Sequence, residues 1–290
     1  MKNAPWWAPG LPEPRFPQSL LTPLQEQYSR PPTGEVDGVD VNVNESVAAA
    51  IREIDIEAQR ALYEEQGSVL MIEDFLPEDV LTHLLEGLKS VDGQAHRNYV
   101  PRQKKGAAIS RFCLDSRAGQ FREFYQAPSL RKLLNSLTGE TLLDCREADP
   151  HTYALYLYDE PGDHIDWHYD TSFYRGKRFT ILIGLVENES CLLECKLHTR
   201  SEGREPESRA YQIKPGSMFL FDGDKLFHRV TPMAEGDSSR VVLTLEFVTD
   251  TSMNAWRKLV SDVKDAFAYF GIREVFLGPK ADSPSPDARV

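Results

Sequence analysis

The second half of the chain is a succession of short hydrophobic stretches separated by turn sequences. Between residues 153 and 248, stretches rich in β-branched and aromatic residues are interrupted by EPGD, KPG, DGD and EGDSS, which are typical of tight turns. The stretches read YALYLY, HIDWHYD, FTILIGLV, SCLLECKLH, SMFLF, FHRVTP and VVLTLEFV. About seven or eight short strands at this spacing predict a β-sandwich or barrel.

Before these strands, the hydrophobic residues recur at helical spacing. Val47, Ile51 and Leu62 belong to a pattern that predicts one helix of about 20 residues, starting at Asn44 and ending before Gly67. A buried strand is expected in SVLMIEDF, followed by a helix over PEDVLTHLLEGLKS, which opens with a proline and acidic residues. We therefore expect a mainly β fold with flanking helices.

Residues 91–116 lack this periodicity. They are basic, contain glycine and include NYVPRQKKGAAISRF, a composition that predicts a mobile loop of the kind that forms lids. The next segment, SRAGQFREFYQAPSLRKLLNSLTG, predicts one or two helices that break at Ala127-Pro128 and stop at Gly139. These helices are expected to pack on the sheet that follows.

The two ends of the chain differ from its middle. Residues 1–43 hold 8 of the 19 prolines and show no sustained apolar period. We expect an arm that docks on its own core or, in a homodimer, on a neighbouring subunit, with a loosely held tail as the alternative. Residues 44–275 form the expected domain, which ends in a helix over WRKLVSDVKDAFAYFGI, and residues 276–290 form a polar tail.

Composition and charge narrow the class of partner. A chain of 290 residues with 41% hydrophobic content can bury a full core. Its formal net charge of −12 repels nucleic acids and anionic membranes, so a small molecule or a protein is the expected partner. No apolar run approaches the roughly 20 residues that span a bilayer, and no secretory signal opens the sequence, so we predict a cytoplasmic protein.

The four cysteines are expected to be buried thiols. Cys113, Cys145, Cys191 and Cys195 are too few for a disulfide scaffold in a chain of this length. The last two, together with His198, suggest zinc, but their spacing matches no common finger and a fourth ligand is missing. We therefore expect no zinc site.

Candidate metal ligands lie in the second predicted strand. In HIDWHYD, residues 164, 166, 168 and 170 are expected on one face, because side chains alternate along a strand. Four ionisable groups on one barrel face are costly to bury without a metal or a partner. Two pairs therefore compete, His164/Asp166 and His168/Asp170.

We favour the second pair because it precedes TSFYRGK, a polar and aromatic loop suited to the mouth of a barrel. Tyr158 lies ten residues before His168, on the preceding edge of the same predicted hairpin, and His228 follows 60 residues after it. Two imidazoles with the carboxylate of Asp170 make the facial triad of a non-haem Fe(II) site. Such a site leaves positions open for a chelating cosubstrate and O₂.

Arg240 is the candidate anion-binding residue. In RVVLTLEF it shares a strand face with Val242, Thr244 and Glu246, whereas the opposite face is apolar and is expected to pack under helices. The guanidinium then points into the barrel, where its planar fork suits a carboxylate. An ion pair with Glu246 is the structural alternative, and the nearby metal triad favours a ligand instead.

Together these motifs resemble the Fe(II)/2-oxoglutarate-dependent oxygenases, especially the prolyl-hydroxylase-like and free-standing small-molecule members. The resemblance rests on HYD, PGSMFLFDGDKLFHRVTP and SSRVVLTLEF, and it extends over roughly residues 67–250. It implies a double-stranded β-helix, that is, a cupin-like jelly roll. It also implies Fe(II) on the triad, and 2-oxoglutarate with its far carboxylate on Arg240, helped by Tyr158 or Thr180.

The resemblance further implies an O₂-dependent oxidation that releases succinate and CO₂. Related halogenases lack the carboxylate of Asp170, so hydroxylation or desaturation is expected. For the substrate we expect a small polar molecule, an amino acid or a metabolite derived from one. Asp166 is the candidate for its ammonium and Arg111 or Arg175 for its carboxylate, although a pair between Asp166 and His164 is the structural alternative. A prolyl-type protein hydroxylase and a non-catalytic jelly-roll binding module are the competing functions.

Overall fold

The computed structural model describes residues 41–171 and 174–253. Most of the N-terminal arm, the expected C-terminal helix and the C-terminal tail lie outside these residues, so the homodimer expected through the arm stays a prediction. The described helices are α2 (Val43–Arg52), α3 (Ile56–Glu65), α4 (Glu78–Ser90), α5 (Arg111–Arg117), α6 (Gly119–Gln126) and α7 (Pro128–Thr138).

All described strands belong to one antiparallel sheet. They are β1 (Val69–Ile72), β2 (His96–Val100), β3 (Lys104–Ile109), β4 (Leu143–Asp144), β5 (Tyr153–Tyr158), β6 (His164–His168), β7 (Arg178–Val186), β8 (Leu193–Leu197), β9 (Glu207–Tyr211), β10 (Met218–Asp222), β11 (Phe227–Val230) and β12 (Arg240–Val248). The main path follows the order β1-β10-β7-β12-β5-β3-β6-β11-β8-β9, with β2 beside β3 and β4 beside β12.

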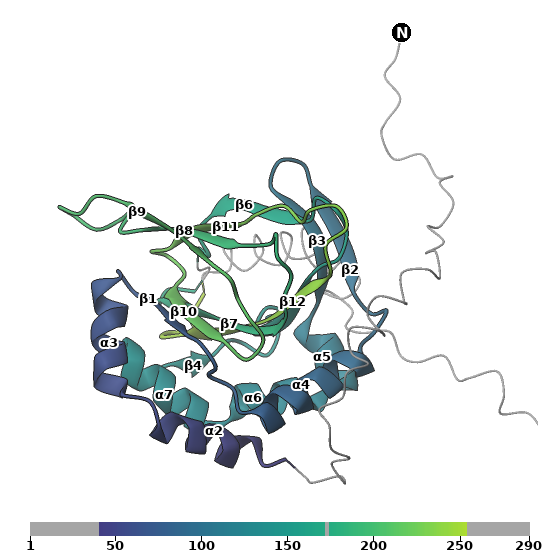
Figure 1. The fold of residues 1–290 in the computed structure, drawn as a ribbon. Helices are drawn as coiled ribbons and strands as arrows, with labels where there is room; N and C mark the ends of the chain where they lie inside the picture. Colours follow the sequence, from purple (N-terminus) through teal and green to yellow (C-terminus); the bar gives the residue numbers. More distant parts are fainter. Residues whose placement is uncertain (1–40, 172–173, 254–290) are drawn as a thin grey trace, which may run out of the picture. The chain divides into compact units, whose positions relative to one another are not determined.

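The sheet curls so that its two ends face each other. In Figure 1, β10, β7 and β12 form one layer and β6, β11 and β8 form the layer opposite. Strand β3 joins the layers, because Ala107–Ile109 pair with β5 whereas Lys104 and Lys105 pair with β6. This arrangement confirms the predicted jelly roll.

Helices cover the outer side of the β7 and β12 layer (Figure 1). Helices α6 and α7 turn apolar side chains toward it, including the fully buried Phe121, Phe124 and Leu130. All nine residues of β12 are buried as a result, because helices cover one face of the strand and the opposite layer covers the other. The sequence pattern predicted these helices correctly, including the break before Pro128 and the left-handed Gly139.

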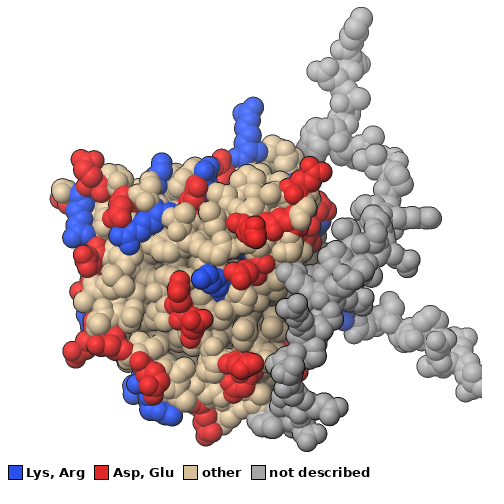
Figure 2. Space-filling model, in the orientation of Figure 1, with Lys and Arg blue, Asp and Glu red and all other residues tan. Residues whose placement is uncertain are grey.

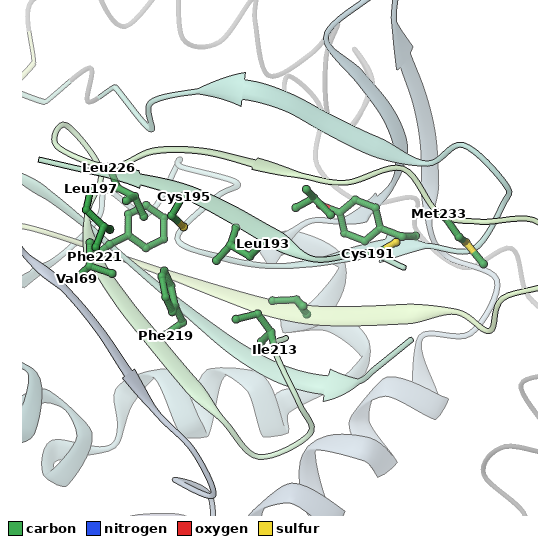
Figure 3. Close-up of a cluster of buried hydrophobic side chains, with 13 residues drawn as sticks. Val69, Cys191, Leu193, Cys195, Leu197, Ile213, Phe219, Phe221, Leu226 and Met233 are labelled. Carbon is green, nitrogen blue, oxygen red and sulfur yellow. The ribbon is translucent and has the colours of Figure 1, made fainter. Parts of the chain in front are cut away.

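A hydrophobic cluster lies between the two layers of the sheet. Figure 3 shows Phe219, Phe221, Leu193 and Cys195 pointing toward one another from β10 and β8. Cys191 belongs to the same cluster, and all four cysteines are buried and form no disulfide with one another. The expectation of buried thiols is therefore confirmed.

Two predicted elements differ in the structure, and one strand was not predicted. The single helix expected after Asn44 is divided into α2 and α3, because Asp55 caps a new helix by accepting a hydrogen bond from the Ala58 amide at 3.0 Å. The loop expected over residues 91–116 forms the β2–β3 hairpin and the start of α5. Strand β9 was not expected, because four of its five residues are exposed and its pattern is polar.

Charged side chains are spread over the surface. On the face that Figure 2 shows, acidic groups outnumber basic ones and the two signs are interspersed over the described residues. No helix among the described residues is long and apolar enough to cross a bilayer.

Candidate active site

A cavity opens between the two layers of the sheet. It encloses about 980 Å³ of empty space, including solvent at its mouth. Every second residue of β12 lines it, as strand alternation predicts: Arg240, Val242, Thr244 and Glu246. The opposite layer contributes His168 from β6 and His228 from β11.

His168, Asp170 and His228 converge in this cavity. Among the described residues they form the one cluster of histidine, cysteine and carboxylate groups whose donor atoms lie close enough to share a metal, all within 4.8 Å of one another. The Oδ1 atom of Asp170 lies 3.4 Å from Nε2 of His168 and 3.9 Å from Nε2 of His228. The two histidines are cross-strand partners on β6 and β11, which fixes their separation.

Backbone carbonyls set the tautomer of both histidines. Nδ1 of His168 lies 2.7 Å from the carbonyl of Asp166, and Nδ1 of His228 lies 3.1 Å from the carbonyl of Leu226. A carbonyl only accepts hydrogen bonds, so each Nδ1 carries the proton and each Nε2 keeps a lone pair. Both lone pairs are therefore available on the side that faces Asp170.

The ionisation states suit a divalent cation. Burial, and then the neighbouring His168, lower the pKa of His228 to about 4, so this imidazole is neutral at neutral pH. Burial alone would raise the pKa of Asp170, but its interactions with His228 first, and then with His168 and Arg178, hold that pKa well below its usual range. The cluster thus combines a neutral imidazole donor with an ionised carboxylate.

Two contacts place the Asp170 carboxylate. The hydroxyl of Thr180 donates to Oδ2 of Asp170 at 3.0 Å, which leaves Oδ1 toward the histidines. Gly223, after β10, permits the approach of the Asp170 backbone, since a Cβ at this glycine would lie 2.8 Å from the Asp170 carbonyl oxygen. Any larger residue at Gly223 would displace the carboxylate.

The competing pair, His164 and Asp166, lies outside the cavity. Strand β6 advances from Ile165 to His168 while β11 advances from Val230 to His228, so β6 contains one extra residue. This bulge reverses the side-chain alternation, and Ile165 lines the cavity whereas Asp166 is exposed. The expectation that residues 164, 166, 168 and 170 share one face was therefore wrong.

Arg240 lies at the deep end of the cavity. Its side chain is 1% exposed, and its guanidinium carbon lies 5.0 Å from the ring centroid of Tyr158, its cross-strand partner on β5. Its Nε atom is buried without a hydrogen-bond partner, and it forms no ion pair within the described residues. The alternative pair with Glu246 is excluded, because Glu246 contacts Arg178 instead.

Glu246 anchors the other end of the cavity. Its Oε2 atom accepts hydrogen bonds from Nε of Arg178 at 2.7 Å and from the hydroxyl of Thr180 at 3.1 Å. Thr180 therefore links Glu246 to Asp170 and lies beside the metal cluster. In the register of the sheet, Thr180 is opposite Glu246, at the other end of β12 from Arg240. Its expected role beside Arg240 is not the role that these contacts favour.

The residues expected to bind substrate are not in the cavity. Asp166 is exposed, Arg111 pairs with Asp115 at 3.3 Å, and Arg175 does not line the cavity wall. The arginine and the aspartate that line the cavity near the metal cluster are instead Arg178 and Asp149. Sequence reasoning missed Arg178, although its spacing of two residues from Thr180 on β7 was an available signal.

The fold is similar to that of solved structures that include a non-haem α-ketoglutarate-dependent epimerase and a prolyl-4-hydroxylase. No protein-family model and no curated protein matches the sequence. The α-ketoglutarate-dependent epimerase SnoN from nogalamycin biosynthesis superposes with a TM-score of 0.56 and 14% identity, over 78% of this chain and 91% of SnoN. A prolyl-4-hydroxylase from Pseudomonas putida superposes with a TM-score of 0.53 and 17% identity, over 68% of this chain and 100% of the hydroxylase. AviO1 from Streptomyces viridochromogenes Tue57 superposes with a TM-score of 0.53 and 16% identity, over 69% of this chain and 97% of AviO1.

Proposed function

We propose that this protein is an Fe(II)/2-oxoglutarate-dependent oxygenase that hydroxylates or desaturates a small polar molecule. One observation carries the proposal. A cluster of two histidines and one aspartate shares a cavity with Arg240, a buried guanidinium that has no carboxylate partner among the described residues. A metal site and an anion site in one cavity are what a metal-chelating dicarboxylate requires.

The residues present fit iron. His168, Asp170 and His228 would hold the ion through Nε2, Oδ1 and Nε2, because two imidazoles with one carboxylate form the facial triad that leaves positions open. The fixed tautomers and the Thr180 contact mean that these donors are oriented before an ion binds. Binding of a metal would therefore cost little side-chain conformational entropy.

The deep end of the cavity fits the far carboxylate of 2-oxoglutarate. Arg240 offers a planar set of donors that no carboxylate of the described residues occupies. Tyr158, its cross-strand partner on β5, also lines the cavity. Burial lowers the pKa of Arg240, which shows that the protein surroundings compensate its charge incompletely. An anion at this position would restore the compensation.

When bound, iron and 2-oxoglutarate supply the oxidation of a substrate C–H bond by O₂, with release of succinate and CO₂. The chain itself positions the reactants. Arg240 fixes the direction of the cosubstrate, and the apolar walls from Ile165, Leu182 and Val230 exclude water around it. The carboxylate of Asp170 fills the third protein position at the metal, which favours hydroxylation or desaturation over halogenation.

The polar mouth of the cavity supports a small polar substrate, such as an amino acid or a metabolite derived from one. Asp149, His151, Tyr156 and Tyr174 line this end. Nδ1 of His151 lies 3.0 Å from the Tyr156 hydroxyl, and the Tyr174 hydroxyl donates to Asp149 at 2.8 Å. This network presents hydrogen-bonding groups of fixed orientation to a ligand.

Anaerobic titration tests the proposal. Adding Fe(II) and then 2-oxoglutarate to the full-length protein should produce a weak visible charge-transfer band, and admitting O₂ should then yield succinate. His164→Ala is a matched control, because His164 lies on β6 outside the cavity and should leave the band intact. A wild-type protein that gives neither band nor succinate would be a binding module instead. Succinate formation stimulated only by peptides would indicate a protein hydroxylase.

A further inference from the structure

Arg178 is the second arginine of the cavity, and only part of its guanidinium is used by the fold. Nε donates to Glu246 at 2.7 Å, whereas Nη1 and Nη2 make no hydrogen bond or ion pair within the described residues. The side chain is 16% exposed and lines the cavity, and these two nitrogens are the guanidinium atoms that the described residues leave for a ligand there.

The orientation of this guanidinium is fixed from behind. Glu246 is 3% exposed and its Oε2 atom also accepts from Thr180, whose hydroxyl contacts Asp170. Arg178 is thus connected through two side chains to the metal cluster. A guanidinium held through Nε presents its Nη1 and Nη2 hydrogens as a parallel pair, which matches the two oxygens of a carboxylate.

The surrounding charges restrict what this pair can bind. Asp149 lines the same end of the cavity, and its oxygens accept from the Tyr174 hydroxyl at 2.8 Å and from the His151 amide at 2.9 Å. Together with Glu246, this makes two carboxylates and one arginine at the mouth. A dianion would be repelled, whereas a zwitterion could place its carboxylate on Arg178 and its ammonium toward Asp149.

We infer that Arg178 binds the carboxylate of the substrate through Nη1 and Nη2, so that the oxygenase acts on a free amino acid or a closely similar zwitterion. This inference rests on the proposed function. It replaces Arg111 and Arg175, which were expected to take the carboxylate and do not line the cavity.

The position of Arg178 separates it from the cosubstrate. Arg240 pairs with Tyr158 at the start of β12, whereas Glu246, the anchor of Arg178, lies six residues further along the same strand. At about 3.3 Å per residue, the two anchor points are roughly 20 Å apart along the backbone. We therefore assign the carboxylate at Arg240 and the carboxylate at Arg178 to two different molecules.

Binding of amino acids and their carboxamides tests the inference. The probes are the twenty common L-amino acids and the corresponding α-carboxamides, added to anaerobic protein that holds Fe(II) and 2-oxoglutarate. The readouts are the dissociation constant, from calorimetry or the shift of the visible band, and the rate of succinate formation after O₂ is admitted. For the best amino acid, the wild type should bind the acid roughly 10- to 100-fold more tightly than the amide.

In Arg178→Gln this preference should fall to about 1, and Arg178→Lys should recover part of it. The single variant leaves Glu246 uncompensated, so Arg178→Gln/Glu246→Gln provides a second variant with a neutral pair and should lose the preference equally. Arg175→Gln is the matched control and should retain it. The dissociation constant of 2-oxoglutarate should stay within about 2-fold of wild type in all four variants.

Three results would overturn the inference. The acid preference could persist in both glutamine variants, the affinity for 2-oxoglutarate could fall instead, or no amino acid could bind to wild-type protein that shows the Fe(II)/2-oxoglutarate band. Failure of the proposed function looks different, because the wild type would then show no band at all.

Discussion

The two ends of the cavity each bury an arginine, and the two guanidiniums have different partners. Arg240 is 1% exposed, packs beside Tyr158 and has no carboxylate partner among the described residues. Arg178 is anchored by Glu246 at 2.7 Å and keeps its two terminal nitrogens toward the cavity. The charge of Arg240 is therefore not compensated by a carboxylate of the described residues, whereas the charge of Arg178 is compensated by Glu246.

The two arginines therefore contribute differently to the stability of the fold and to ligand binding. A buried charge without a partner costs several kcal/mol, so Arg240 does not stabilise the ligand-free protein, and the anion proposed to bind there would explain its placement. Arg178 compensates Glu246, whose pKa is raised by burial even in the presence of that partner. Loss of Arg178 is therefore expected to weaken both folding and binding, whereas loss of Arg240 is expected to weaken binding alone.

The largest effect is expected at the metal ligands, on which both ends depend. His168→Ala or His228→Ala should reduce succinate formation at least about 1000-fold, since two remaining ligands do not hold iron in the required geometry. Folding should survive, because these side chains face the cavity. Metal content and succinate yield check this result. A variant that still binds Fe(II) as tightly as wild type would remove that histidine from the site.

The next effect separates the two arginines by ligand. Arg240→Ala should raise the KM for 2-oxoglutarate by roughly 100-fold while Fe(II) affinity stays within about 2-fold, because a charge-assisted pair is lost at a distance from the metal. Arg240→Lys should rescue part of the loss. Steady-state kinetics and metal titration measure both quantities. Unchanged dependence on 2-oxoglutarate in Arg240→Ala would place the cosubstrate elsewhere.

Stability should respond to the two arginines with opposite signs. In metal-free protein without 2-oxoglutarate, Arg178→Met should lower the free energy of unfolding by about 2–3 kcal/mol, because Glu246 is left buried and unpaired. Arg240→Met should leave it unchanged or raise it by about 1 kcal/mol, because an uncompensated charge is removed. Urea unfolding of both variants gives the comparison.

Acid should relieve the Arg178→Met defect. Burial raises the pKa of Glu246, so protonation favours the folded state, and the stability that protonation provides is lost as pH rises through the folded pKa. The difference between Arg178→Met and wild type should therefore shrink as pH falls. If Arg240→Met were as destabilising as Arg178→Met, Arg240 would have a structural partner and the contrast between the two ends would fail.

The sequence predicted the elements whose hydrophobic period is strong and local. The inward face of β12 and the break before Pro128 follow from strand alternation and from turn chemistry. In each case the residues that carry the signal lie within one element. Such features require no knowledge of what packs against them.

The features that the sequence did not predict depend on partners distant in the chain. The segment 91–116 forms a hairpin because β3 pairs with β5 on one side and β6 on the other, and those pairings override its weak local pattern. Asp166 faces outward because a register shift against β11 reverses the alternation of β6. The proposed role of Arg178 depends on Glu246, a residue on another strand that holds its Nε.

The smallest expected effects distinguish Tyr158 from Thr180, both of which the family resemblance places beside the cosubstrate carboxylate. Tyr158 is the cross-strand partner of Arg240, whereas Thr180 contacts Asp170 at 3.0 Å and Glu246 at 3.1 Å. Tyr158→Phe should therefore raise the KM for 2-oxoglutarate by about 5-fold, the loss of one hydrogen bond of roughly 1 kcal/mol. Its Fe(II) affinity should not change.

Thr180→Val should give the converse result. The substitution keeps the shape of the side chain but removes the donor to Oδ2 of Asp170, so Fe(II) affinity should fall by about 10-fold while the KM for 2-oxoglutarate changes by less than about 2-fold. Each variant is the control for the other, since Tyr158 and Thr180 line the same cavity at opposite ends. If Thr180→Val raised the KM for 2-oxoglutarate more than Tyr158→Phe did, the cosubstrate would lie along the Glu246 end of β12, and the assignment of Arg240 and Arg178 to two different carboxylates would have to be exchanged.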